Sequence, residues 1–218
     1  MSAFSYGFYR QGMDGRNDAR LGAALVAIKR ELNYNGFGKN LVIDTFVFGD
    51  AASNRLGDFQ ESKGLKRDEQ AGPITLRELF RKRVEQTELF HGFEKGTLGK
   101  QIFLESAFDP VAVGVVDPED TGIAQINLRI HSDITQTQAF DPVFSIKWAA
   151  DYIDSAAARI ENEINVLKAA RAAYNVGAEY AKQWLLAGFP ETGGPQLGDE
   201  DSFARATNYI KIIDQQNW

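Results

Sequence analysis

The 218-residue chain contains no cysteine and only two histidines, His91 and His131. Without cysteine it can form neither a disulfide framework nor a thiolate metal site. Two imidazoles do not make an imidazole-rich zinc site, which counts against a zinc amidase or a zinc endopeptidase. The sequence therefore predicts that no metal and no other cofactor takes part.

Long apolar runs and an excess of positive charge are also missing. No stretch approaches the roughly 20 apolar residues that a membrane helix requires, and the first residues contain no apolar run of signal-peptide length. A net charge of −6 gives no electrostatic attraction to nucleic acid or to an anionic membrane. We therefore expect a soluble protein without a targeting segment, which neither binds nucleic acid nor inserts into a membrane.

What the chain does contain is enough apolar material for a buried core. Hydrophobic residues make up 44% of it and aromatic residues 11%. A helix-like segment runs into a glycine-punctuated stretch between residues 83 and 99, which indicates a boundary between two domains. We predict a mainly α-helical protein in which residues 1–84 form one domain and residues 85–218 form the other.

Three short helices are predicted in the first domain. Apolar residues recur at helical spacing over residues 21–32, behind the polar pair Asn17 and Asp18. A second helix is predicted after Asp50, with Gly64 as its stop, and a third begins at Pro73, a residue suited to the first helical position. By themselves these helices are equally typical of a small bundle without a specific role.

The residues at the turns between these helices carry a resemblance. The run from Phe48-Gly49 through Gly64-Leu65 and Gly72-Pro73 to Leu79 resembles the peptidoglycan-binding domain that accompanies many wall hydrolases. That family usually has an Asp-Gly turn before its Gly-Pro. This chain reads Asp-Glu-Gln-Ala over residues 68–71, which predicts a different turn geometry.

Four motifs occur in order in the second domain: FLESAFDP ending at Pro110, DTGIAQIN ending at Asn127, AYNVG over residues 173–177, and a late Tyr209. Each motif alone is short enough to arise by chance. In this order and at these separations they resemble the catalytic core of the soluble lytic transglycosylases and goose-type lysozymes, which cut the glycan strands of peptidoglycan. The resemblance implies a lysozyme-like helical domain and peptidoglycan glycan strands as the substrate.

Glu105 lies near the C-terminal end of a short predicted helix, with apolar residues on both sides of it. Burial among apolar neighbours disfavours the charged form of a carboxyl group and raises its pKa. Glycosidic cleavage requires such a pKa, because the leaving sugar oxygen must receive a proton near neutral pH. We interpret Glu105 as the general acid. Without this context, a solvated surface glutamate is the ordinary interpretation.

Hydrolysis with two carboxylates requires a second Asp or Glu. Its candidates Asp117, Glu119 and Asp120 lie in a loop-like stretch that is also typical of a solvated acidic turn. Goose-type lysozymes commonly have a carboxylate where this chain has Asn127, and an amide cannot serve as a base. The resemblance thus favours a lytic transglycosylase, in which Glu105 later acts as base on the substrate's own 6-hydroxyl and the product is a 1,6-anhydro sugar. A hydrolytic lysozyme that uses one of the acidic residues stays open.

Further motif residues are predicted to contact the substrate. Gln125 can donate and accept hydrogen bonds, which suits sugar hydroxyl and N-acetyl groups, and Asn127 follows it in the same motif. By resemblance, Tyr174 places its hydroxyl near the catalytic acid, Asn175 shapes the groove and Tyr209 lines the cleft. The alternatives are a helix cap for Asn175 and a buried core aromatic for Tyr209.

The rest of the second domain is predicted to be helical around one loop. Asp141-Pro142 reads as a helix cap followed by a first-turn proline, and a helix with Trp148 and Tyr152 on its core face follows. Residues 190–202 are polar and rich in glycine and proline, which predicts a loop. Ser202 is the predicted cap of a last helix.

A wall-binding segment ahead of a catalytic segment, without a signal peptide, resembles a bacteriophage endolysin. Such an enzyme waits in the host cytoplasm as a monomer until a holin opens the membrane, and it then reaches the cell wall. Its target is the β-1,4 bond between N-acetylmuramic acid and N-acetylglucosamine. A virion-associated lysin is the nearest variant, and a non-catalytic wall-binding or virion structural protein is the alternative from another class.

Overall fold

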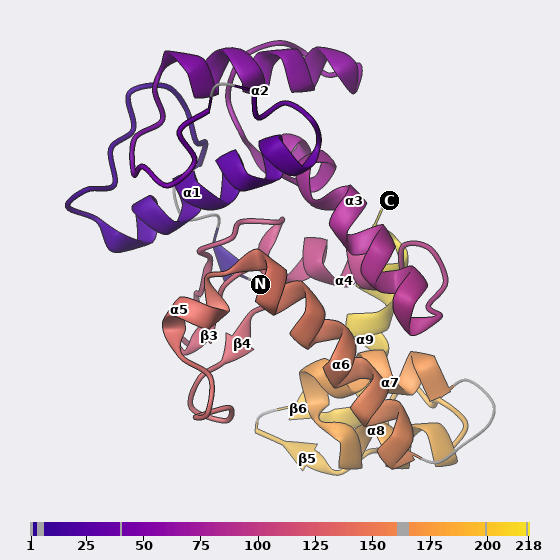
Figure 1. Ribbon diagram of the computed structural model, residues 1–218. Helices are drawn as coiled ribbons and strands as arrows, with labels where there is room; N and C mark the ends of the chain where they lie inside the picture. Colours follow the sequence, from indigo (N-terminus) through magenta and orange to yellow (C-terminus); the bar gives the residue numbers. More distant parts are fainter. Residues whose placement is uncertain (1, 4–6, 40, 161–165, 199, 217) are drawn as a thin grey trace. The chain divides into compact units, whose positions relative to one another are not determined.

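The computed structural model describes residues 2–3, 7–39, 41–160, 166–198, 200–216 and 218 (Figure 1). The described residues form nine α-helices, whereas every strand is only two residues long. The predicted mainly α class is therefore confirmed. Within the described ranges, no helix has both the length and the apolar character that crossing a bilayer demands.

The chain packs as two compact units, and each unit combines two separate stretches of sequence. The first unit contains Met1–Thr87 and Glu105–Ile146, and the second contains Glu88–Leu104 and Lys147–Trp218. The boundaries between the units fall inside three helices, α3 (Pro73–His91), α4 (Thr97–Ser106) and α6 (Pro142–Ile160). These units do not test the predicted division into domains of residues 1–84 and 85–218, which stays a prediction.

The N-terminal helices of the first unit begin and end where the sequence indicates. Helix α1 (Ala19–Tyr34) starts after Asp18, whose side chain accepts a hydrogen bond from the backbone N–H of Leu21 at 3.0 Å. Helix α2 (Asp50–Ser62) buries the apolar face that the spacing predicts, and Gly64 lies just beyond its end with φ +67°. Helix α3 (Pro73–His91) begins at the predicted proline.

The turn between α2 and α3 passes through Glu69, whose φ of 57° lies in the left-handed region. The amide of Gln60, which is 1% exposed, organises this turn. Its oxygen accepts hydrogen bonds from the backbone N–H groups of Asp68 and Glu69 at 3.2 and 2.9 Å. Its nitrogen donates to the Asp68 carboxylate at 2.8 Å and to the Gln70 carbonyl at 3.1 Å. A buried side chain thus shapes the turn where the resembling family has an Asp-Gly pair.

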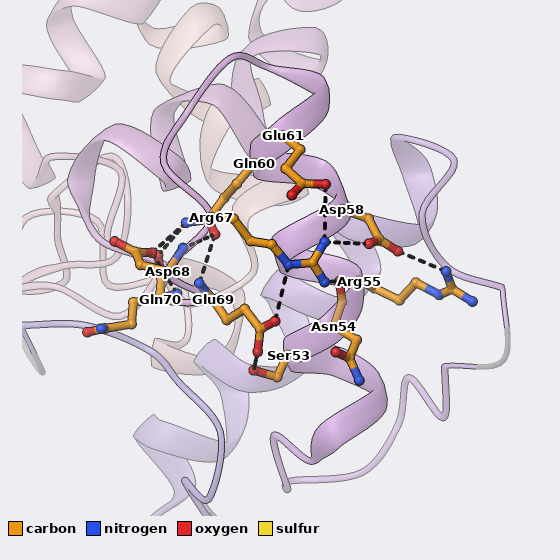
Figure 2. A network of polar contacts seen from close by, with 10 residues as sticks. All are labelled: Ser53, Asn54, Arg55, Asp58, Gln60, Glu61, Arg67, Asp68, Glu69 and Gln70. Carbon is orange, nitrogen blue, oxygen red and sulfur yellow. Dashed lines mark hydrogen bonds and ion pairs between the residues drawn. The ribbon is translucent and has the colours of Figure 1, made fainter.

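Arg67 extends this network along the outside of α2, as Figure 2 shows. Its guanidinium group forms ion pairs with Asp58, Glu61 and Glu69 at 3.0, 3.2 and 3.4 Å. The Glu69 carboxylate also accepts a hydrogen bond from the Ser53 hydroxyl at 2.8 Å. The side chain of the strained residue is therefore fixed from two sides.

A small antiparallel sheet joins the two stretches of the first unit. Its strand order is β1 (Ser2–Ala3), β2 (Val113–Gly114), β3 (Asp120–Thr121) and β4 (Ile126–Asn127). The pairs Ser2 with Gly114 and Thr121 with Ile126 set its register. The short helix α5 (Gln136–Ala139) follows, and Asp141 then accepts a hydrogen bond from the Val143 N–H at 2.9 Å, as a cap of α6 should.

In the second unit, helices α7 (Val166–Val176), α8 (Ala178–Leu186) and α9 (Ser202–Asp214) pack against one another (Figure 1). The predicted loop over residues 190–202 contains a short hairpin of β5 (Gln196–Leu197) and β6 (Glu200–Asp201). The expected cap Ser202 is wrong by one residue. Asp201 caps α9, because its carboxylate accepts from the N–H groups of Phe203 and Ala204 at 2.8 and 3.1 Å.

Candidate active site

Glu105 is the second-last residue of α4 and is half-buried, in agreement with its predicted place near the helix end. The helix stops because the chain then passes through two consecutive left-handed residues, Ala107 with φ 52° and Phe108 with φ 66°. Residues with a Cβ rarely adopt this conformation, and it persists only where the surroundings hold it. The candidate acid therefore lies beside a strained turn.

Ser106 connects this turn to the next motif. Its hydroxyl, on a residue that is 2% exposed, donates a hydrogen bond to the carbonyl oxygen of Ile123 at 2.7 Å. Ile123 lies two residues before Gln125. The structure thus brings the motif of Glu105 and the motif of Gln125 together inside the first unit, through a residue to which the sequence analysis gave no role.

Asp109 secures the other end of the strained turn and was also missed from the sequence. Both Asp109 and Tyr9 are fully buried, and the Tyr9 hydroxyl donates to the Asp109 carboxylate at 2.6 Å. The ring of the buried Phe108 stacks on Phe80 of α3, with 6.3 Å between the ring centroids. The one feature of the sequence that could have indicated this contact is an aspartate among apolar residues. A buried aspartate needs a hydrogen-bonding or charged partner.

The second motif turns sharply at Gly122, where φ is +77°. A Cβ at this position would lie 1.8 Å from the backbone oxygen of Ala139, so no residue other than glycine fits. Gln125 follows at φ 51°, and its side-chain nitrogen donates to the Gly122 carbonyl at 3.0 Å. The Gln125 amide therefore closes its own turn, and a role in binding sugar stays a prediction.

The predicted acidic candidates Asp117 and Asp120 both contact Asn127 of β4. The Asn127 side-chain nitrogen donates to Asp120 at 2.8 Å and to Asp117 at 3.1 Å. Its oxygen accepts from the backbone N–H groups of Arg129 and Ile130, each at 3.2 Å. Asn127 thus holds the acidic hairpin together, and its predicted contact with substrate is not tested by these bonds.

The pKa values of the two carboxyl groups in this hairpin are shifted in opposite directions. A backbone hydrogen bond from Glu119, together with Asn127 and the guanidinium of Arg129 at 2.7 Å, lowers the pKa of Asp117. Burial raises the pKa of Asp120, and the charge of Asp117 adds to that effect. The contacts of Asp117 therefore stabilise its charged form. Burial disfavours the charged form of Asp120.

In the second unit, Tyr174 of α7 joins an aromatic cluster. Its ring meets Trp148 and Tyr152 of α6 edge to face, with centroids 6.0 and 5.2 Å apart. The Tyr152 hydroxyl donates to the Ala173 carbonyl at 3.2 Å, and burial raises the Tyr152 pKa. The sequence placed Trp148 and Tyr152 in the core, but the structure leaves all three rings half-buried.

The last two predicted substrate residues differ in exposure. Asn175 is exposed near the end of α7, which stops at Val176, and Gly177 follows with φ +82°. The predicted helix end is therefore confirmed. Tyr209 is only 8% exposed on α9. The roles of Tyr174, Asn175 and Tyr209 toward a substrate stay predictions, because these residues belong to the second unit and the acidic residues to the first.

One family model matches the part of the chain that carries most of the motifs. Residues 88–188 match the family model of the Transglycosylase SLT domain. A search of curated proteins finds no match to the chain. The matched segment contains Glu105, Gln125 and Tyr174, and it ends before Tyr209. This similarity supports a lysozyme-like catalytic domain whose substrate is peptidoglycan.

Proposed function

We propose that the protein is a peptidoglycan lytic transglycosylase that cleaves the β-1,4 bond between N-acetylmuramic acid and N-acetylglucosamine. Glu105 is its general acid and then its base. The observation that carries the proposal is the placement of Glu105, half-buried at the end of α4 and beside a strained turn, within the segment that matches the Transglycosylase SLT domain.

In the proposed reaction Glu105 donates its proton to the glycosidic oxygen, and the bond between this oxygen and C1 of the muramic acid breaks. The muramic acid 6-hydroxyl then forms a bond to C1 and gives its proton to Glu105, which restores the acid. The products are a 1,6-anhydro-muramyl end and a free 4-hydroxyl on the glucosamine. No water is consumed.

The acidic hairpin supports this non-hydrolytic route. A second carboxylate in a hydrolase must either attack the sugar or activate a water molecule. Asp117 is bound by Asn127 and Arg129, and its lowered pKa shows that these contacts stabilise the anion where it is. Of the two remaining hydrolytic candidates, Glu119 is exposed, and Asp120 has a raised pKa that makes it a poorer anion.

The test is digestion of purified peptidoglycan with mass spectrometry of the released muropeptides. The proposal predicts anhydro-muramyl ends from the wild type and a release by Glu105→Gln that is lower by about 10²- to 10⁴-fold. Asp117→Asn and Asp120→Asn should release the same anhydro products. Reducing ends that disappear in Asp120→Asn would instead establish a hydrolytic lysozyme. No release by the wild type would leave the wall-binding or structural interpretation.

We further propose that the protein acts as a phage-type endolysin, held in the host cytoplasm until a holin gives it access to the wall. The support is the order along the chain, in which a peptidoglycan-binding-like segment precedes the catalytic segment. Expression in host cells with and without a holin tests this role. Lysis only with the holin is expected, whereas association with purified virions would favour a virion-associated lysin.

A further inference from the structure

A cavity of about 800 Å³ lies in the first compact unit, outside the elements that carry the catalytic motifs. It is lined by α1 and the two residues before it, by Arg83 of α3, and by residues 136–137 and 140–143. This volume is typical of a small-molecule site, as are its apolar wall residues such as Ala23 and Phe140. The cavity therefore has the size of a ligand pocket.

Charged groups of both signs line this cavity in equal number. The acidic residues are Asp18, Glu31 and Asp141, and the basic residues are Arg20, Arg30 and Arg83. A pocket with balanced charges on apolar walls favours a ligand that carries both signs over a simple anion or cation.

Glu31 provides an independent sign of a ligand. It is only 2% exposed, and both hydrogen bonds from Arg83, at 2.9 and 2.6 Å, go to the same carboxylate oxygen. The other oxygen is buried and has no hydrogen-bond partner among the residues that the structure describes. A buried carboxylate oxygen without a partner is costly, and native structures rarely keep one without a reason.

The surroundings of Glu31 favour a positively charged partner for that oxygen. Burial raises the Glu31 pKa in opposition to Arg83, and the negative charge of Asp141 raises it further. Asp141 lines the same cavity. A cation bound at Glu31 would therefore relieve both the desolvation of its carboxylate and the repulsion from Asp141.

A partner for an anionic group is available on the same wall. Arg30 lines the cavity, and its side chain is 56% exposed. Its ion pair with Asp44, at 3.3 Å, is weak and open to exchange because the Asp44 side chain is 83% exposed. Arg30 can therefore turn to a carboxylate without breaking a buried contact.

We propose that this cavity binds an amino-acid zwitterion, with its ammonium group at Glu31 and Asp141 and its carboxylate at Arg30. Such a group can come from two sources, the diamino acid of a peptidoglycan stem peptide or a free amino acid. The stem-peptide source rests on the proposed function, whereas the zwitterion site does not. A stem-peptide site would hold the protein on its polymeric substrate.

The test is isothermal titration of the full-length protein with a muramyl tripeptide that ends in diaminopimelate, and with free diaminopimelate. Acetylation of the side-chain amine removes the ammonium group and should weaken binding by about tenfold or more. Glu31→Gln keeps the shape of the side chain but removes its charge, and it should weaken binding to a similar extent.

Because Glu31→Gln leaves Arg83 without its ion pair, a second variant guards against a folding defect. Ala23→Trp places a large side chain from α1 in the cavity, and it replaces neither Glu31 nor Arg83. The matched control is Ala158→Trp, at an exposed position of α6. The proposal predicts that Ala23→Trp abolishes binding and that Ala158→Trp binds like the wild type.

The outcomes separate this proposal from the catalytic one. Binding of the tripeptide alone assigns the stem peptide, and equal binding of free diaminopimelate assigns a free amino acid. Absence of binding by every probe, or binding that survives both Glu31→Gln and Ala23→Trp, overturns the zwitterion site. Peptidoglycan cleavage without zwitterion binding would contradict only this inference. Zwitterion binding without cleavage would contradict only the proposed function.

Discussion

Two of the turns in the first unit that place residues other than glycine at left-handed φ values are held by different means. The turn before α3 has Glu69 at φ 57° and is held by the amide of Gln60. The turn after α4 has Ala107 and Phe108 at φ 52° and 66° and is held through its neighbours Ser106 and Asp109. Strain alone therefore does not mark an active site, since only the second turn adjoins a candidate acid.

The largest expected effect is a loss of catalytic rate when the acid beside the turn after α4 is replaced. Glu105→Gln should lower the rate of peptidoglycan digestion by about 10²- to 10⁴-fold, because an amide cannot supply the proton that the leaving oxygen needs. The rate is measured as release of soluble muropeptides. Glu94→Gln, at an exposed position just before α4, is the matched control and should digest at the wild-type rate. A similar loss in both variants would remove the special role of Glu105.

Gln60→Ala should produce the largest effect on stability. It removes the amide that holds Asp68, Glu69 and Gln70, so the free energy of unfolding should fall by about 3 kcal/mol. Urea denaturation followed by circular dichroism measures this loss. A change below about 1 kcal/mol would show that the turn does not depend on the Gln60 network.

The acidic hairpin gives a prediction of pH dependence. The pKa of Asp117 is lowered on folding, so its charge contributes stability above the unfolded pKa that is lost as pH falls through the folded one. The pKa of Asp120 is raised, so its charge opposes folding at neutral pH and its proton relieves that cost in acid. Asp117→Asn should therefore destabilise at pH 7, and Asp120→Asn should not.

Thermal unfolding of these two variants at pH 7 and near pH 3 measures the difference. As the pH falls toward 3, Asp120→Asn should approach the wild type first, because the raised pKa of Asp120 lets it take up its proton earlier. The gap between Asp117→Asn and the wild type should narrow last, because the lowered pKa keeps Asp117 charged further into acid. Destabilisation by Asp120→Asn at pH 7 that equals the effect of Asp117→Asn would contradict the assigned directions.

The smallest expected effects come from relieving the strain itself. Glycine adopts left-handed φ values freely, but it also raises the entropy of the unfolded chain. Ala107→Gly and Glu69→Gly should therefore each change the free energy of unfolding by less than about 1 kcal/mol. Only Ala107→Gly should slow digestion, because it loosens the turn beside Glu105. Equal digestion rates would show that rigidity at this turn is not needed.

Helix positions were largely predictable from the sequence because they depend on local signals. Pro73 and Gly64 mark helix ends through their φ preferences, and the structure confirms both. The polar pair Asn17 and Asp18 marks the start of α1, and the structure shows that Asp18 is the cap. The cap of α9 was misplaced by one residue because Asp201 and Ser202 are adjacent and both suit the role.

The contacts that build the candidate site were not predictable. Ser106 pairs with Ile123, and Tyr9 pairs with Asp109, which lies 100 residues further along the chain. Such partners are set by the tertiary fold, and neither hydrophobic spacing nor turn residues encode them. The sequence could name Glu105 through motif order, but it could not show what holds the turn that follows it.

The most direct test of the difference between the two turns compares Ser106→Ala with Gln60→Ala. Digestion of purified peptidoglycan is measured per folded molecule, with the folded fraction taken from circular dichroism. Ser106→Ala removes the bond between the two catalytic motifs and should digest more slowly than the wild type, whereas folded Gln60→Ala should digest at the wild-type rate. Equal rates for the two variants would contradict a catalytic role for the turn after α4.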